Sequence, residues 1–187
     1  MSNKIETRVF ESRFKTQNRQ ITGHGSVFNT ETELYPGTFE KVDPHFFDDV
    51  LNNDVRALFN HDSNLVLART KSGTLKLSVD TTGLKYVIPN MPNTTTGNDL
   101  LELISRGDIS QSSFSFTTKT DKWEKRADGS QLRTLLKCET LYDVSPVTYP
   151  AYPTADVAQK SQTAKPKART MTASARIRAI KIISMNL

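Results

Sequence analysis

Residues 107–118 have the sequence GDISQSSFSFTT, in which serines alternate with two phenylalanines. An alternation with a period of two is typical of a β-strand that buries one face, because successive side chains point to opposite sides. Phe114 and Phe116 share one face with Ser112, and phenylalanine favours the core. Ser113 lies on the opposite face, so we expect its hydroxyl to point out of the core towards a cleft, provided that no bulge shifts the alternation.

Short strands separated by turns account for most of the remaining pattern. The clearest is a hairpin over residues 73–89, in which two alternating runs flank a turn at 80–83. Residues 29–42 are expected to form a loop with a turn at 35–37. We expect the other strands within residues 5–28 (two strands), 55–61, 109–118, 133–138 and 140–149.

Two short helices interrupt the strands. Asp43-Pro44 resembles an N-cap followed by proline at the first helical position, which predicts a helix that ends near residues 52–53. Residues 96–99 have the spacing of a capping box, and the helix predicted over 100–104 is followed by Gly107 at the usual position of a glycine cap. The pattern as a whole predicts a β-rich α+β fold, a small closed or partly open β-barrel decorated with a few helices.

The basic residues are concentrated at the end of the chain. The net charge is +5, but residues 157–187 hold seven lysines and arginines and no acidic residue, which leaves 18 basic and 20 acidic side chains in residues 1–156. The hydrophobic content of 36% is low for a compact chain. We therefore expect one domain over residues 1–156 and a basic tail over 157–187 that is disordered or removed. The isoleucines within residues 170–187 form only an untidy helical pattern.

Several classes of protein are disfavoured by what the sequence lacks. A single cysteine, Cys138, allows no internal disulfide and fits a reducing compartment. No stretch approaches the roughly 20 apolar residues that span a bilayer, and residues 1–6 lack the apolar core of a secretory signal, so we expect a soluble intracellular protein without membrane contact. No metal-binding spacing of histidines and cysteines occurs, so neither a metal site nor a cofactor is expected.

A serine and a histidine in strand-like segments are the minimum for a serine hydrolase. His61 follows the apolar run 55–59, at the predicted end of a strand. In such an enzyme the histidine accepts the hydroxyl proton and the serine oxygen attacks a carbonyl carbon. His24 and His45 are the competing histidines, and Ser112 competes with Ser113.

A third group would orient the histidine and stabilise the imidazolium ion. Asp143 lies in a predicted strand on the face opposite Tyr142. Glu139 shares the alternation of Asp143, and Asp62 lies next to His61 in the chain. The pattern alone does not decide which of these three carboxylates would orient the histidine.

Several segments, in this order, resemble the prohead (capsid-maturation) serine proteases of tailed bacteriophages. Residues 106–116 are similar to the family's rGdisgmSfgF, and residues 143–153 are similar to its EVSlVtyPAYp. The resemblance covers about residues 21–157. The chain departs from the family pattern by having Ala68, Gln111, Ser112 and Ser115 where the family has Gly, Gly, Met and Gly. The other similar segments are 21–28, 35–39, 58–62 and 67–70.

The resemblance implies a serine endopeptidase with His61 as the base and Ser113 as the nucleophile. Asp143 would be the acid, at a position where the family more often has glutamate. The resemblance also implies a fold like that of the herpesvirus assemblins, whose triad runs in the order His, Ser, His.

The resemblance further implies a setting. Such proteases act in the host cytoplasm inside the assembling procapsid, where they cleave scaffold and capsid protein and then themselves. We therefore expect the scaffold and major capsid proteins as substrates, and self-cleavage after about residue 155 or docking of the basic tail on acidic scaffold. A homodimer or higher oligomer is expected by analogy alone.

Two other classes of function compete with the protease. The first is a non-enzymatic, capsid-associated scaffolding or structural protein whose basic tail binds scaffold or DNA. The second is a nucleic-acid-binding barrel, which is disfavoured because residues 1–156 lack a surface pattern of basic and aromatic residues.

Overall fold

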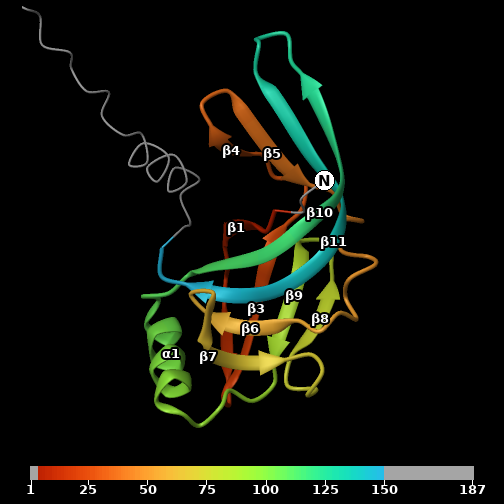
Figure 1. The fold of residues 1–187 in the computed structure, drawn as a ribbon. Helices are drawn as coiled ribbons and strands as arrows, with labels where there is room; N and C mark the ends of the chain where they lie inside the picture. Colours follow the sequence, from red (N-terminus) through yellow and green to blue (C-terminus); the bar gives the residue numbers. More distant parts are fainter. Residues whose placement is uncertain (1–3, 150–187) are drawn as a thin grey trace, which may run out of the picture. The chain divides into compact units, whose positions relative to one another are not determined.

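The computed structural model describes residues 4–149, and the strands of this part form two sheets (Figure 1). The main path of the larger sheet runs in the order β1 (Glu6–Glu11), β10 (Gln111–Lys125), β11 (Gln131–Val147), β5 (Thr38–Val42) and β4 (Thr32–Tyr35), with β6 (Arg56–Phe59) and β7 (Asp62–Arg69) beside it. β10 and β11 are central in this sheet. β6 pairs with both β11 and β7, and β11 runs parallel to β5 and β6.

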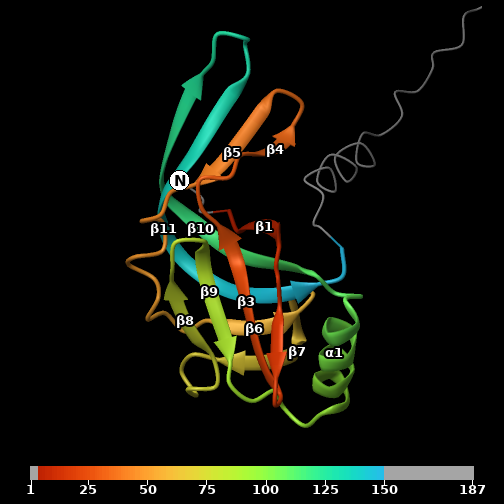
Figure 2. The ribbon, with the colours of Figure 1, turned by 180° about the vertical axis from the view of Figure 1, so that it is seen from behind.

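The smaller sheet is antiparallel, and its strands β3, β9 and β8 lie side by side in the view of Figure 2. Its order is β2 (Lys15–Gln17), β3 (Gln20–Val27), β9 (Gly83–Ile88) and β8 (Lys76–Val79). The β8–β9 hairpin confirms the hairpin predicted over residues 73–89. The described residues contain many strands and one helix, which confirms the β-rich α+β class. Neither sheet closes into a barrel within residues 4–149.

Phe114 and Phe116 enter the core, as their alternation with serine predicts. Both side chains are fully buried, and their ring centroids lie 4.6 Å apart. Phe46 packs edge-on against Phe116 at 5.4 Å, and Phe47 packs against Phe114 at 5.3 Å. These four rings fix which face of β10 is buried, and so which serines face the other way.

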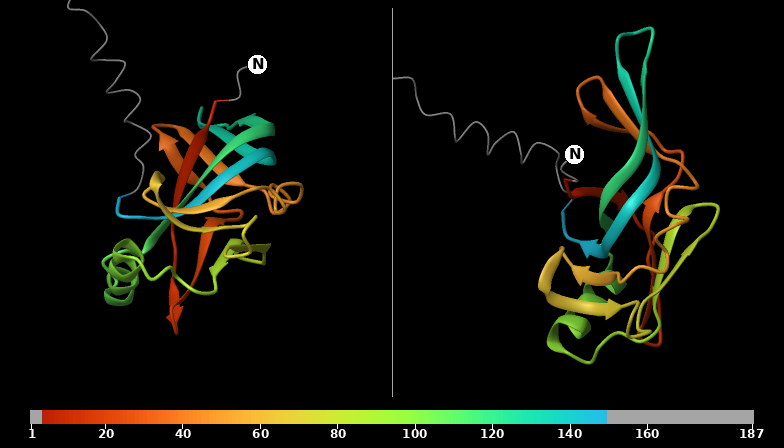
Figure 3. Two further views of the ribbon diagram at one scale, coloured as in Figure 1. Left: turned by 60° about the horizontal axis from the view of Figure 1, so that its bottom comes forward. Right: turned by 45° about the vertical axis from the view of Figure 1, so that its right-hand side comes forward.

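The prediction of three strands over residues 109–149 was wrong, because β10 and β11 form one long hairpin. Its outer part projects from the body beside the β4–β5 hairpin (Figure 3). The register shifts at several points between Ser115 and Asp121. Such β-bulges let a strand continue where strict alternation of side chains is lost, which is why the pattern seemed to break.

The prediction of a helix over residues 43–53 was also wrong. Consecutive turns occupy this segment, with i→i+3 bonds such as Phe46 N to Asp43 O at 3.0 Å and Val50 N to Phe47 O at 3.1 Å. The carbonyl of Phe46 accepts from Cys138 N on β11 at 2.9 Å. That carbonyl is therefore used in a tertiary contact. This contact favours a series of turns, in which both adjacent phenylalanines are buried, and disfavours a helix with one apolar face.

The second predicted helix is present as α1 (Thr95–Arg106). Gly107 ends it with a left-handed φ of 82°, as expected for a glycine cap. The N-cap is Thr94, whose hydroxyl accepts from Gly97 N, and lies two residues before the predicted one.

Two further segments differ from the prediction. Residues 29–42 hold the β4–β5 hairpin instead of a loop, although the turn at 35–37 is present and Gly37 has a φ of 75°. The strand predicted over 55–61 is shorter, because β6 ends at Phe59 and the chain reverses into β7. The predicted tail over 157–187, its weak helix and the cleavage expected near residue 155 lie outside the described residues.

Candidate active site

The structure brings the side chains of His61, Ser113 and Asp143 into one hydrogen-bonded series. His61 Nε2 lies 2.6 Å from Ser113 Oγ, and His61 Nδ1 lies 2.6 Å from Asp143 Oδ1. The three residues are separated by up to 82 positions in the sequence. Ser113 and Asp143 come from the paired strands β10 and β11, whereas His61 comes from the β6–β7 hairpin.

A tight two-residue turn presents His61. The turn is Asn60-His61, between Phe59 and Asp62, and both of its residues have positive φ values, 54° and 59°. These values match a type I′ turn, which suits the twist of a hairpin. Asparagine and histidine tolerate the left-handed region better than most residues.

The turn is also tied to the end of β11. Asn60 N donates to Pro146 O at 3.0 Å, and Asn60 Oδ1 accepts from Thr148 N at 2.8 Å. Because β11 also carries Asp143, these bonds hold the imidazole on the strand that supplies its carboxylate.

Ser113 and Ser112 lie on opposite faces of β10, as the alternation predicts. Ser112 Oγ lies on the core side, 3.0 Å from the buried Tyr86 hydroxyl, and donates to Ser145 O at 3.3 Å. Burial raises the pKa of Tyr86, with a smaller opposing contribution from Ser112, so the phenol stays neutral. The expectation that Ser113 faces an open cleft was wrong, because Ser113 has no exposed surface.

Asp143 is the carboxylate that reaches the imidazole. It lies directly opposite Ser115 in the β10–β11 ladder and is only 7% exposed. Glu139 is exposed and is skipped at a bulge, where Thr117 pairs with Thr140 and Thr118 pairs with Cys138. The bulge removes Glu139 from the alternation that it shares with Asp143 in the sequence.

The other competing residues are engaged elsewhere. His24 Nε2 lies 3.0 Å from Asp80 Oδ2, and His45 Nδ1 lies 3.0 Å from Asp48 Oδ2. Asp62 accepts from the backbone N–H of Asn64.

Sequence reasoning missed three groups that surround the series. Ser145 donates to Asp143 Oδ1 at 2.6 Å, and Ser115 Oγ lies 3.1 Å from His61 Nδ1. The carbonyl of Arg8, in β1, lies 2.9 Å from Ser113 Oγ. Ser115 and Ser145 each lie two residues from a candidate and share its face, so the alternation held a signal for them, whereas Arg8 was not foreseeable without the pairing of β1 with β10.

The arrangement suits nucleophilic catalysis by serine. With its Nδ1 proton directed at Asp143, the neutral imidazole presents the Nε2 lone pair to the Ser113 hydroxyl, as in a Ser–His–Asp triad. The 2.6 Å separation is within the reach required for proton transfer.

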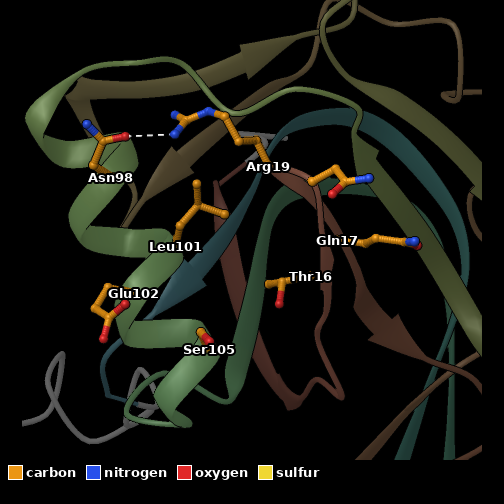
Figure 4. Close-up of a pocket in the computed structure, with 8 residues that line it drawn as sticks. Thr16, Gln17, Arg19, Asn98, Leu101, Glu102 and Ser105 are labelled. Carbon is orange, nitrogen blue, oxygen red and sulfur yellow. Dashed lines mark hydrogen bonds between the residues drawn. The ribbon is translucent and has the colours of Figure 1, made fainter.

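A polar hollow between β2 and α1 is not part of this arrangement. Figure 4 shows Arg19 reaching across to Asn98 Oδ1, at 2.9 Å, along one side of it. Arg19 also donates to the carbonyls of Met91 and Pro92, so its guanidinium holds the loop before α1. None of the residues that line the hollow belongs to the Ser–His–Asp series.

Two kinds of feature, a metal-binding cluster and a membrane-spanning helix, are absent from residues 4–149. No group of three or more histidine, cysteine, aspartate or glutamate side chains is placed to hold a metal ion. No helix within that range is long and apolar enough to cross a membrane.

A serine hydroxyl, an imidazole and a carboxylate in series are the arrangement that serine hydrolases use. A family model described as caudovirus prohead serine protease matches residues 3–170 of the 187-residue chain. The chain therefore belongs to the caudovirus prohead serine protease family, as its motifs indicated, and is a phage protein of the serine protease class. Comparisons with curated proteins and with solved structures found no match.

Proposed function

We propose that this chain is an endopeptidase that uses His61, Ser113 and Asp143 to cleave scaffold and major capsid protein inside the assembling procapsid, in the host cytoplasm. The observation that carries the proposal is the 2.6 Å separation of His61 Nε2 and Ser113 Oγ, with Asp143 at 2.6 Å on the other ring nitrogen. Membership of the prohead protease family supplies the setting and the class of substrate.

The reaction runs through an acyl-enzyme. His61 takes the Ser113 proton while Oγ attacks the scissile carbonyl carbon, and Asp143 stabilises the resulting imidazolium ion. His61 then gives the proton to the leaving amine, and water hydrolyses the ester on Ser113 by the same steps in reverse. Ser145, which donates to Asp143 Oδ1, keeps the carboxylate aimed at the ring.

The proposal extends to organisation beyond the described residues. We propose that the protease domain covers residues 1–156, that the basic tail over 157–187 docks on acidic scaffold or is trimmed by the enzyme itself, and that the protein forms a homodimer or higher oligomer. We also propose a fold like that of the herpesvirus assemblins, with the two sheets as a partly open barrel. Superposition of an experimental structure on an assemblin tests the fold, and light scattering tests the oligomeric state.

The test of the nucleophile uses two neighbouring serines. Ser113→Ala should abolish cleavage of the capsid and scaffold proteins during co-expression, with the thermal unfolding temperature kept near that of the wild type. Ser112→Ala, on the other face of β10, should retain substantial activity. Unchanged processing by Ser113→Ala would refute the assignment and favour a non-enzymatic structural role.

Self-trimming is tested by the intact masses of the wild type and of Ser113→Ala. The proposal expects the wild type to lose its tail after about residue 155 while Ser113→Ala keeps it. A tail present in both proteins excludes self-trimming and leaves docking on scaffold as its role.

A further inference from the structure

The N-terminal strand β1 contacts the Ser113 hydroxyl directly. β1 is the edge strand of the larger sheet, and every residue of β1 is paired with β10, with Val9 opposite Ser113. The carbonyl oxygen of the preceding residue, Arg8, lies 2.9 Å from Ser113 Oγ. Since Ser113 has no exposed surface, a peptide carbonyl carbon has no path to Oγ while this packing persists.

This contact also opposes the proton transfer that catalysis needs. The Ser113 hydroxyl has one proton and two acceptors, Arg8 O and His61 Nε2. If the proton goes to Arg8 O, then Nε2 must donate to Oγ and cannot act as the base. If the proton goes to Nε2, two oxygens face each other at 2.9 Å without a proton between them, which is unfavourable.

A cluster of charged side chains around the buried Glu40 holds β1 in this position. Glu40 is only 3% exposed, and its carboxylate accepts from Arg8 Nη2 at 2.9 Å and from Arg133 Nη1 at 3.0 Å. Glu6, also in β1, accepts from Thr118 Oγ1 at 2.7 Å and from Arg133 Nη2 at 3.1 Å. We call these five residues the Glu40 cluster. Hydrogen bonds between charged groups with so little solvent contact are stronger than those at the surface.

None of the three proposed catalytic side chains belongs to β1. His61 is presented by β6 and β7, and Asp143 by β11, so moving β1 away leaves the series assembled. Movement of β1 away from β10 would also expose the backbone N–H and C=O groups of β10 on either side of Ser113. An exposed strand edge binds extended peptides by adding them as a further strand.

We propose that β1 is a displaceable strap that occupies the substrate edge of β10. In the strapped form the carbonyl of Arg8 holds the Ser113 hydroxyl; release of the Glu40 cluster frees the edge, and an extended segment of substrate pairs antiparallel with β10 in its place. This proposal rests on the proposed function, because it assigns the regulation of the same serine.

A reversible cross-link tests the strap. Glu11 and Gln111 lie directly opposite each other in the β1–β10 ladder and touch through their side chains. In the double variant Glu11→Cys/Gln111→Cys, a disulfide would lock β1 in place. A fluorophosphonate should label Ser113 at least about tenfold more slowly in the oxidised form than in the same protein after reduction. The wild type, whose single Cys138 is buried, is the control for the redox treatment.

A second variant loosens the strap without a cross-link. Glu40→Gln removes the charge at the centre of the Glu40 cluster and should speed labelling several-fold while the protein stays folded by circular dichroism. Glu31→Gln is the matched control, since Glu31 pairs with Arg126 at a more exposed site. Equal rates in the locked and unlocked forms would overturn the strap and leave the proposed function standing. Absence of labelling in every form, Glu40→Gln included, would instead contradict the proposed function.

Discussion

The carboxylate of Asp143 is fixed from two sides at a single oxygen. Its Oδ1 lies 2.6 Å from His61 Nδ1 and accepts from Ser145 Oγ, also at 2.6 Å. The residue is nearly buried, so these bonds are made with little competition from water. A carboxylate held in this way selects the imidazole tautomer that carries its proton on Nδ1 and leaves Nε2 free to act as a base.

Replacement of this carboxylate by an amide should therefore impair catalysis while keeping the fold. Asp143→Asn is expected to lower kcat by about 10³–10⁴-fold, because the ring then favours the tautomer with its proton on Nε2. Glu139→Gln, four residues earlier and exposed, should stay within about twofold of the wild type. Steady-state cleavage of a capsid-derived peptide gives both values, and the opposite ranking would move the third role to Glu139.

At the residue scale the sequence was informative wherever the strands are regular. The alternation around Phe114 correctly predicted that Ser113 and Ser112 lie on opposite faces of β10. It could not separate Asp143 from Glu139, because the bulge at Glu139 depends on how β11 pairs with β10, and that pairing is set by contacts distant in the sequence. The burial of Ser113 was not foreseeable either, since it depends on the packing around β10 and not on the serine's own segment.

At the scale of elements, the β6–β7 hairpin positions His61 through its turn. Asn60 takes a left-handed φ of 54°, and its side chain bonds to both the backbone and the hydroxyl of Thr148. Asn60 therefore has two roles: its backbone adopts the left-handed conformation that the turn requires, and its side chain attaches the turn to Thr148.

Two substitutions separate these roles. Asn60→Ala loses the side-chain hydrogen bonds to Thr148 and also strains the turn, whereas Asn60→Gly loses the same bonds but tolerates the left-handed region. We expect Asn60→Ala to be less stable than Asn60→Gly by about 1 kcal/mol in urea unfolding. Equal stability of the two variants would show that the turn imposes no such conformational demand.

The attachment of β1 should depend on pH. Burial alone would raise the pKa of Glu6, but its hydrogen bonds with Arg133 and Thr118 and the nearby charges of Arg133 and Arg8 lower it from 4.5 to about 2. A carboxyl whose pKa is depressed by folding contributes stability that is fully present above its unfolded pKa and is lost as pH falls towards the folded value. The contribution of Glu6 is therefore lost between about pH 4.5 and pH 2.

Glu6→Gln should accordingly flatten this part of the stability profile. The free energy of unfolding of the wild type, measured in urea at pH 5 and pH 3, should fall more steeply than that of the variant. Identical slopes for the two proteins would contradict the account of Glu6.

At the scale of the whole described unit, the core joins residues from both sheets and from the turns over residues 43–53. Cys138 lies in this core at 2% exposure, and burial raises the pKa of its thiol to about 12. Its amide donates to Phe46 O, so the cysteine sits where β11 meets the turns.

Cys138 is therefore a reporter of global opening. As the only cysteine of the chain, it should react with a thiol reagent at pH 8 at least about 100-fold more slowly in the native protein than in urea, because the reactive thiolate is both rare and covered. Comparable rates in the two conditions would show that this part of the core opens readily.

The class of fold was predictable from the sequence, but its assembly was not. Alternating strands, the β8–β9 hairpin and the cap at Gly107 depend on local rules and were found. The turns before Asn53 were mistaken for a helix, because the bond from Cys138 to Phe46 is a tertiary contact. The charged outer part of β10 was missed, because it has no apolar alternation. The order of strands, with β11 parallel to β5 and β6, likewise has no local signal.

The central claim is that Ser113 is the nucleophile of the protease. The most direct measurement is covalent labelling of the full-length protein with a fluorophosphonate, followed by mass mapping of the modified peptide. The account predicts a single adduct on Ser113 that is lost in Ser113→Ala and in His61→Ala but retained in Ser112→Ala. An adduct on another serine, or one that persists in Ser113→Ala, would contradict it.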